Sequence, residues 1–157
     1  MSNETLLHRI QTLHTRYIRV IDDNALEQWP ALFTRNGTYR ITTRENHLAG
    51  LPMPLFSCRG QGMMQDRITG LRKINVYEPH CYRHQTSGLE ILENTENTVR
   101  CISNFLVIRT MHTGAMSIFA TGVYLDQLTD TDSGLLFSER LVITDSRQTD
   151  TLLVIPL

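Results

Sequence analysis

Hydrophobic positions at the start of the chain repeat at helical spacing. Apolar side chains recur every three or four residues, at Leu6, Ile10, Leu13, Tyr17, Val20 and Ile21. Such a stripe is typical of an amphipathic helix that packs one face against a core. The pattern therefore predicts a helix over residues 2–21, with its charged side chains mostly on the opposite face.

The next stretch, residues 22–42, holds Trp29, the only tryptophan of the chain. Asn24 and Glu27 have the spacing of a capping box and predict the start of a second helix. Pro30 lies too far into that helix to be a first-turn proline, so we expect a kink or a restart there. Trp29 is expected to be buried where this second helix meets the sheet.

Turn signals and helical spacing then alternate. Asn36-Gly37 predicts a turn before a short strand over Thr38–Thr42. Residues 43–60 carry two glycines and two prolines and predict a long surface loop. Residues 61–77 return to helical spacing, with Met64, Ile68 and Leu71 on one face.

The second half of the chain has the pattern of long strands. Four segments are rich in Val, Ile, Thr, Tyr and Phe, namely His80–Leu92, Val99–Thr110, Ala115–Leu128 and Leu135–Thr144. The connections between them are short, which makes sequential strands antiparallel neighbours. A last strand is predicted over Thr151–Ile155.

This order of elements predicts an α+β fold. Helices that are separated from an antiparallel meander pack together on one side of the sheet. We expect one domain over residues 1–157, in which three helices close the concave face of a strongly curved sheet to form a cone. This shape resembles the nuclear-transport-factor-2-like, or SnoaL-like, fold.

Two of the strands carry apolar residues on both faces. An antiparallel sheet with one face in water alternates apolar and polar positions instead. Residues 99–110 and 115–128 break this rule at Ile102, Leu106, Ile108, Ile118, Val123 and Leu125, among others. Since the helices cover only the concave side, we expect another chain to cover the convex side.

Composition and charge exclude several functional classes. The chain has 157 residues and a formal net charge of -1, so no broad basic field for nucleic acid is expected. Of the 15 basic residues only Lys73 is a lysine, and arginine is enriched in protein interfaces. The same excess is more simply explained by genome composition.

The cysteines and the apolar runs point to a reducing compartment. The 3 cysteines form no CxxC pair, which argues against a disulfide framework and against structural zinc. The first residues are polar and charged, unlike a signal peptide. No apolar run approaches the length of a membrane span, about 20 residues. We expect a cytoplasmic protein without membrane contact.

His80, Cys81 and His84 are close enough in sequence to be considered as metal ligands. On a strand, the two histidines share a face but stand roughly 13 Å apart, at about 3.3 Å per residue. Cys81 points to the opposite face. The spacing therefore favours a buried core or interface role for His84 over a metal site.

A second candidate is an acid/base site inside the cone. Tyr17, Asp22 and Asp23 come from the helical part, and His84, Asp126 or Glu139 could face them from the strands. The simpler alternative is that Asp22 and Asp23 are cap residues in water.

Glu139 and Arg140 are neighbours on a predicted strand, so one faces outward and the other inward. A buried arginine needs a carboxylate partner. A structural ion pair is therefore expected here in preference to catalysis.

Taken together, the motifs resemble one family, the small (beta) subunits of aromatic-ring-hydroxylating dioxygenases. The matching stretches run in order along the chain: Asp22-Asp23, Trp29, Leu32-Phe33, Tyr39-Arg40-Ile41, Asp66-Arg67-Ile68, Leu71-Arg72, Tyr82-Arg83-His84, Phe137-Ser138-Glu139-Arg140, Asp145-Ser146 and Pro156-Leu157. Residues 109–114 and 119–126 resemble the subunits of terephthalate dioxygenases in particular. Tyr77 and Gly88 depart from the pattern of many beta subunits.

The resemblance implies a non-catalytic structural subunit that holds no cofactor. The Rieske 2Fe-2S cluster and the mononuclear iron would belong to a separate alpha subunit, and the substrate would be an aromatic acid such as terephthalate. The beta chains would trimerise within an alpha3beta3 hexamer. Arg83, His84, Arg109 and Arg140 are the candidate interface residues. The alternative is a stand-alone cone-shaped isomerase or dehydratase.

Overall fold

The computed structural model describes residues 2–51, 53–74, 78–147 and 155–157. The elements follow one another as α1 (Asn3–Asp22), the 3-10 turns η1 (Leu26–Gln28) and η2 (Pro30–Leu32), β1 (Phe33–Thr43), α2 (Arg44–Leu48), β2 (Phe56–Arg59), α3 (Gly60–Ile74), β3 (His80–Asn94), β4 (Thr98–Met111), β5 (Met116–Thr131) and β6 (Gly134–Thr144). The four long strands predicted from the sequence are confirmed as β3 to β6.

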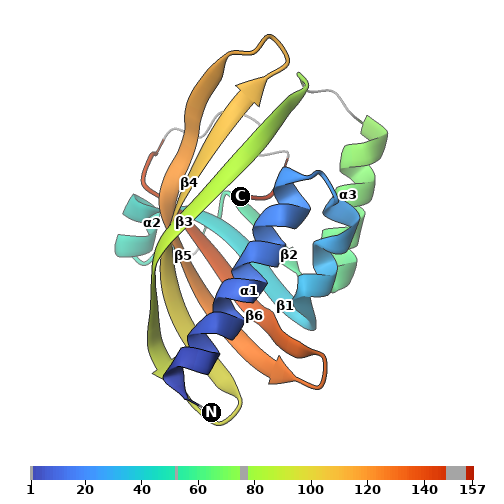
Figure 1. Ribbon diagram of the computed structural model, residues 1–157. Coiled ribbons are helices and arrows are strands. Elements are labelled where there is room, and N and C mark those ends of the chain that lie inside the picture. Colours follow the sequence, from blue (N-terminus) through green and yellow to red (C-terminus); the bar gives the residue numbers. More distant parts are fainter. Residues whose placement is uncertain (1, 52, 75–77, 148–154) are drawn as a thin grey trace.

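The strands form one curved sheet in the order β2-β1-β6-β5-β4-β3. The pair β1 and β6 is parallel, and the other neighbours are antiparallel. Helices α1 and α3 lie against the concave side (Figure 1). The predicted cone of α+β class is therefore confirmed.

Helix α1 has the buried stripe that the sequence predicted. Leu6, Ile10, Leu13, Tyr17, Val20 and Ile21 are each 8% exposed or less. The helix begins after Ser2, whose side chain accepts the backbone N–H of Thr5 at 3.3 Å as an N-cap. Helix α3 likewise buries Met64, Ile68 and Leu71, and its predicted end at residues 75–77 lies outside the described residues.

The predicted second helix is wrong in detail, because two 3-10 turns replace it. Pro30 is the first residue of the second turn, where a proline needs no N–H partner. Asn24 does not cap: it has φ +57°, and its Oδ1 accepts from Arg72 at 2.9 Å. A tertiary contact with α3 has taken the place of the predicted capping box.

Asn36-Gly37 forms no hairpin turn and lies within strand β1. The pairing with β6 shifts register between Phe33 and Thr38, so the extra residues form a bulge. A Cβ on Gly37 would lie 2.9 Å from the carbonyl oxygen of Phe137, which explains the glycine. Turns and bulges favour the same residues, so the local signal did not distinguish them.

The predicted loop over residues 43–60 holds two short elements. Thr43 Oγ1 accepts the N–H of Asn46 at 3.1 Å and caps the one-turn helix α2. Strand β2 then pairs with β1 at the edge of the sheet, with Cys58 opposite Tyr39. The predicted last strand, Thr151–Ile155, lies almost entirely outside the described residues.

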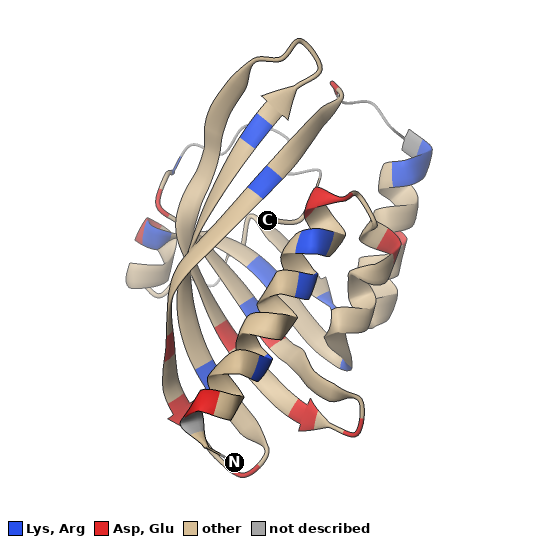
Figure 2. Cartoon of the chain, viewed as in Figure 1, with Lys and Arg blue, Asp and Glu red and all other residues tan. Residues whose placement is uncertain are grey.

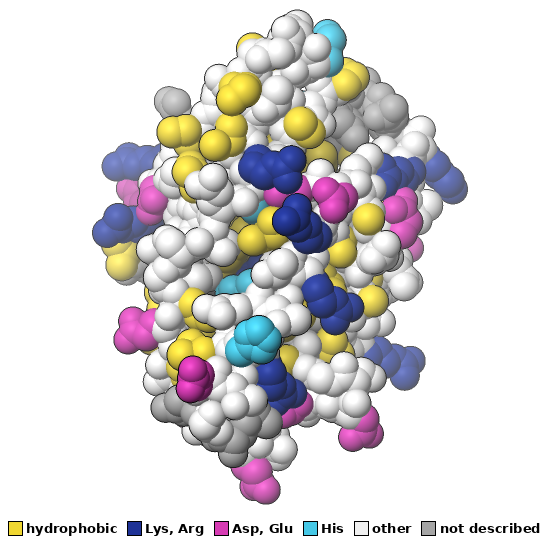
Figure 3. Space-filling view, viewed as in Figure 1, with side chains coloured by type: hydrophobic (Ala, Val, Ile, Leu, Met, Phe, Trp, Pro, Cys, Tyr) yellow, Lys and Arg dark blue, Asp and Glu magenta, His cyan; other side chains and the backbone are white. Residues whose placement is uncertain are grey.

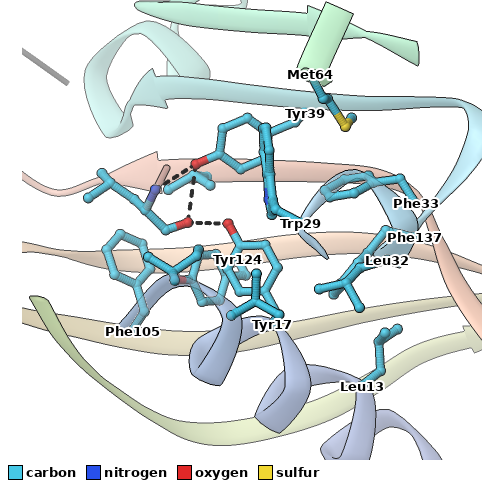
Figure 4. Close-up of a cluster of buried hydrophobic side chains, with 14 of the residues drawn as sticks. Leu13, Tyr17, Trp29, Leu32, Phe33, Tyr39, Met64, Phe105, Tyr124 and Phe137 are labelled. Atoms are coloured by element: carbon cyan, nitrogen blue, oxygen red, sulfur yellow. Dashed lines mark hydrogen bonds between the residues drawn. The ribbon is translucent and has the colours of Figure 1, made fainter. Parts of the chain in front are cut away.

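Trp29 lies at the centre of the core, as predicted, and is fully buried. Its ring contacts those of Phe33 and Tyr39 edge to face, with ring centroids 5.6 Å and 5.1 Å from that of Trp29 (Figure 4).

Charged residues of both signs are intermixed along the helices and strands (Figure 2). Among the described helices, none is long and apolar enough to cross a membrane.

Candidate functional site

A buried carboxylate–imidazole pair joins the end of α1 to β3. Asp22 ends the helix, and its side chain is 1% exposed. Its Oδ1 lies 2.6 Å from Nδ1 of His84, and its Oδ2 accepts the backbone N–H of His84 at 2.9 Å. The alternative that Asp22 is a cap in water is therefore wrong, whereas Asp23 is exposed. The pair fastens the helix to the sheet.

A second buried cluster joins α1, β5 and β6. Arg140 donates from Nε to Oδ1 of Asp126 at 2.8 Å and from Nη2 to Oδ2 at 2.7 Å, which is a bidentate ion pair. Nε2 of His14 lies 3.0 Å from the same Oδ2. All three residues are at most 5% exposed. Of Glu139 and Arg140, the structure thus places Arg140 inside, and the expected structural ion pair is the one with Asp126.

Aromatic rings surround the Arg140 guanidinium. Its Cζ lies 4.1 Å from the ring centre of Tyr17, 3.9 Å from that of Tyr124 and 4.3 Å from that of Phe137. Cation–π contacts of this kind stabilise a cation that has been removed from water. The arginine thus has partners on its edge and on its faces.

The environment sets the protonation states in this cluster. Burial disfavours the charged form of Asp126, but the charge and hydrogen bonds of Arg140 hold the pKa of this carboxyl below its usual value. Burial lowers the pKa of His14, despite the opposing contact with Asp126. At neutral pH the cluster is an arginine–aspartate ion pair beside a neutral imidazole.

His14, Cys101 and Asp126 are close enough to be tested as metal ligands. Their ligand atoms lie within 4.8 Å of one another, and all three residues are buried. However, Arg140 already occupies both oxygens of Asp126. Burial also raises the pKa of Cys101 to about 12, which keeps the thiol protonated, whereas a metal needs the thiolate. The arrangement fits a structural network better than a metal centre.

The residues near the start of β3 take the positions that strand spacing predicted. The Tyr82 ring contacts those of both His80 and His84, with centroids 5.0 and 6.2 Å away, whereas Cys81 is exposed. The two imidazoles are thus separated by an aromatic ring on one face of the strand. This geometry supports the core role of His84.

Glu139 also has a partner from a neighbouring strand. Its carboxylate forms an ion pair with Arg40 of β1. Both side chains are partly exposed, at 35% and 39%, so Glu139 does not join the buried cluster. It alternates with Arg140 across the two faces of the sheet, as the sequence predicted.

The four candidate interface residues differ in position. Arg83 is exposed on β3, and the guanidinium of Arg109 lies 4.8 Å from the ring centre of Phe119. His84 and Arg140 are buried with partners inside the chain. Only Arg83 and Arg109 are placed where they could reach another chain.

A hollow of about 360 Å³ opens between α1 and strands β3 and β4. Its lining is mostly neutral and polar: Gln11, His14, Thr15, Thr86, Ser87, Gly88, Leu89 and Ser103. Tyr17, Asp23 and His84, which belong to the candidate acid/base set, are not among these lining residues. Around this hollow the described residues do not assemble the candidate acid/base site.

His14 is the buried group that the sequence analysis missed. Its position was nonetheless readable, because it lies four residues after Ile10 and three before Tyr17 on the apolar stripe. A polar residue on a buried helix face requires a partner. Asp126, between Tyr124 and Leu128 on the inner face of β5, supplies it.

Known proteins resemble this chain over most of its length. The profile of the family described as SnoaL-like domain matches residues 5–141. The chain is 41% identical over 150 residues to the terephthalate 1,2-dioxygenase terminal oxygenase component subunit beta 1 of Comamonas sp., covering 95% of this chain and 97% of that one. It is 38% identical to the anthranilate 1,2-dioxygenase small subunit of Burkholderia cepacia, covering 94% and 92%.

A solved structure agrees with these relatives. It is described as the beta subunit of an aromatic-ring-hydroxylating dioxygenase from Novosphingobium aromaticivorans. It superposes with a TM-score of 0.90 at 29% identity and covers 98% of each chain.

Proposed function

The chain belongs to the SnoaL-like domain family and, within it, to the small subunits of aromatic-ring-hydroxylating dioxygenases, and from this premise we propose that it is a non-catalytic structural subunit of such an oxygenase. The proposal rests on the pairing of the charged groups inside the cone. Asp22 is paired with His84, and Asp126 is paired with Arg140, so these four side chains do not line an open cavity. The first pair holds α1 to β3, and the second joins β5 to β6 and meets His14 of α1.

The interior gives little support to a stand-alone isomerase or dehydratase. A general acid or base must reach the proton that it transfers. The Asp22 carboxylate is closed off by His84, and the Tyr17 hydroxyl donates to the main-chain oxygen of Leu157. The relatives that match over nearly the whole chain are also subunits of oxygenases.

The partner in this proposal is a catalytic alpha subunit that carries the Rieske cluster and the mononuclear iron. In the described part of this chain, the candidate metal ligands His14, Cys101 and Asp126 fit a metal poorly. We propose an aromatic acid as the substrate of the assembly, since terephthalate and anthranilate in the names of the relatives share a ring carboxylate. The proposed location is the cytoplasm, where the free thiols of Cys58, Cys81 and Cys101 persist.

Co-purification with the alpha subunit tests this assignment. We expect the two chains to elute together when co-expressed, with all iron in the alpha chain after the two are separated. The small subunit alone should be colourless, because iron–sulfur clusters need closely grouped thiolate or imidazole ligands. Visible absorbance and metal analysis of each chain are the measurements. A Rieske-type absorbance band in the small subunit alone would contradict the proposal.

We further propose that the small subunits associate with one another, as a trimer within an alpha3beta3 hexamer, through the outer face of the sheet. Apolar residues on this face are only partly buried within the chain, among them Ile102, Leu106, Val123 and Leu125. At the end where β4 turns into β5, Met116 is 70% and Ile118 68% exposed. On the helix-bearing side, hydrophobic side chains are also visible around this end of the molecule (Figure 3). Arg83 and Arg109 are the proposed polar residues at this contact.

Sedimentation of the small subunit at micromolar concentration tests the association. The wild-type chain should sediment as an oligomer, and Ile118→Glu should raise its dissociation constant roughly tenfold or more, because a charge would be buried at the contact. Leu48→Glu, at a position that is 76% exposed on α2, is the matched control and should have no effect. A wild-type chain that remains monomeric would refute the outer-face interface.

A further inference from the structure

Residues 155–157 lie inside the cone and are held there by specific hydrogen bonds. Ile155 is 8% exposed and Leu157 is fully buried. The Leu157 N–H donates to the hydroxyl of Tyr39 at 2.8 Å, and the Tyr39 hydroxyl donates to the Leu157 main-chain oxygen at 3.1 Å. The Tyr17 hydroxyl donates to the same oxygen (Figure 4).

The two tyrosines come from separate elements and converge on one oxygen. Tyr17 lies on α1 and Tyr39 on β1, and both are fully buried. Burial raises the pKa of Tyr17 to about 12 and that of Tyr39 well above its usual value. Both phenols therefore keep their protons at neutral pH and remain donors. Two preset donors around one carbonyl oxygen are what a binding site for that group requires.

The same interior also contains buried polar atoms that no described residue satisfies. The Tyr124 hydroxyl and Nη1 of Arg140 are buried and make no hydrogen bond with any described residue. Native proteins satisfy most buried polar atoms, so such groups need an explanation. Tyr124 and Arg140 are in contact with each other, and Arg140 is in contact with Tyr17. The unused groups thus lie beside the tyrosine that holds Leu157.

We propose that the cone interior is a binding site for a short apolar peptide whose last main-chain oxygen accepts both tyrosine hydroxyls, and that residues 155–157 occupy it as the chain's own ligand. Tyr17 and Tyr39 hold the oxygen, and the surrounding core holds the aliphatic side chains. A tethered segment acts at a high effective concentration and excludes free ligands from the site. The interior is therefore closed to outside molecules for as long as the segment stays in place.

A peptide added in trans tests the proposal. A chain shortened by residues 155–157 should melt at a lower temperature than the full chain. Acetyl-Ile-Pro-Leu should then raise its melting temperature in a saturable way, by roughly 5–10 °C at a concentration about a hundred times the dissociation constant. A peptide without effect on the shortened chain, or a shortened chain as stable as the full one, would overturn the proposal.

Tyrosine variants separate recognition from simple core filling. In the shortened chain, Tyr17→Phe with Tyr39→Phe should weaken peptide binding roughly tenfold or more, because two hydrogen bonds to the oxygen are lost. Tyr82→Phe removes another buried phenol, one that stacks on Phe119, and should leave peptide binding unchanged. Equal binding by the double variant and the unsubstituted shortened chain would show that the segment only fills space.

A second measurement uses the full-length chain. In Tyr39→Phe the Leu157 N–H loses its acceptor, so its hydrogen exchange should accelerate roughly tenfold or more relative to the wild type. Amides in the middle of β5 should exchange at unchanged rates. An unchanged exchange rate at Leu157 would overturn the assigned contact without depending on whether the shortened chain folds.

Discussion

Replacing Trp29 by alanine should lower the free energy of unfolding by about 3–5 kcal/mol. The indole is fully buried and meets Phe33 and Tyr39 edge to face, so alanine would leave a cavity where the 3-10 turns meet the sheet. A loss of this size is a large part of the roughly 5–15 kcal/mol that stabilises a domain. For a chain of this length it corresponds to a fall in melting temperature of roughly 6–20 °C.

Thermal unfolding followed by far-ultraviolet circular dichroism is the suitable measurement. The variant lacks the only tryptophan, so its fluorescence cannot be compared with that of the wild type. Protein concentration must be matched, because association shifts the melting temperature. Leu48→Ala, at an exposed position, should change stability by no more than about 0.5 kcal/mol. An unaltered melting temperature for Trp29→Ala would mean that the indole does not support the core.

Replacing Arg140 by methionine should have an effect of similar size. Methionine can occupy much of the same space among Tyr17, Tyr124 and Phe137, but it leaves Asp126 buried without its cation. Breaking a buried ion pair from one side typically costs about 3–5 kcal/mol. Urea unfolding at neutral pH should show this loss, and Asp126→Leu should show a comparable one.

The double variant Asp126→Leu with Arg140→Met distinguishes a charge effect from a packing effect. Removing both charges leaves neither partner unpaired, so its stability should return most of the way to that of the wild type. If the two losses simply add, the ion pair is not the cause. Arg40→Met removes an arginine from a partly exposed ion pair with Glu139 and should cost at most about 1 kcal/mol.

The pH dependence has a predictable sign. The pKa of Asp126 is lowered in the fold, so the stability that it supplies is present at neutral pH and is lost as pH falls through the folded value. The lowered pKa of His14 acts in the same direction, because the unfolded chain takes up this proton first as pH falls below about 6.5. In Arg140→Met, the buried Asp126 carboxyl should take up a proton more readily, so the difference from the wild type should shrink in acid.

The interior of the cone explains why these predictions concern stability. Asp22–His84 connects α1 to β3, 62 positions further along the chain, and Asp126–Arg140 connects the neighbouring strands β5 and β6. Residues 155–157 fill the space between Tyr17 and Tyr39. The buried ion pairs and the hydrogen bonds of Tyr17 and Tyr39 thus stay within the chain, which suits a subunit that serves as a scaffold.

The sequence by itself determined the elements whose signal is periodic. The stripe of α1 and the face of α3 follow from the spacing of apolar residues, because burial of one face imposes that spacing, and the long strands β3 to β6 follow from runs rich in Val, Ile, Thr, Tyr and Phe. It also determined that Trp29 is in the core and that Glu139 and Arg140 face opposite sides of the sheet. The family resemblance added the subunit assignment, which the relatives support.

Only the tertiary structure decided the elements and contacts whose local signals are ambiguous. Asn36-Gly37 suits a turn and a bulge equally, and pairing with β6 selected the bulge. Asn24 could cap a helix, but Arg72 of α3 took its side chain.

The partners of Asp22 and His14 were also decided by the folded chain. His84 and Asp126 lie 62 and 112 positions further along the sequence, respectively. Hydrophobic periodicity reports which face of an element is buried, because that depends on near neighbours. It does not predict which polar groups contact each other in the interior, because those contacts depend on sheet order and register, which the whole chain determines.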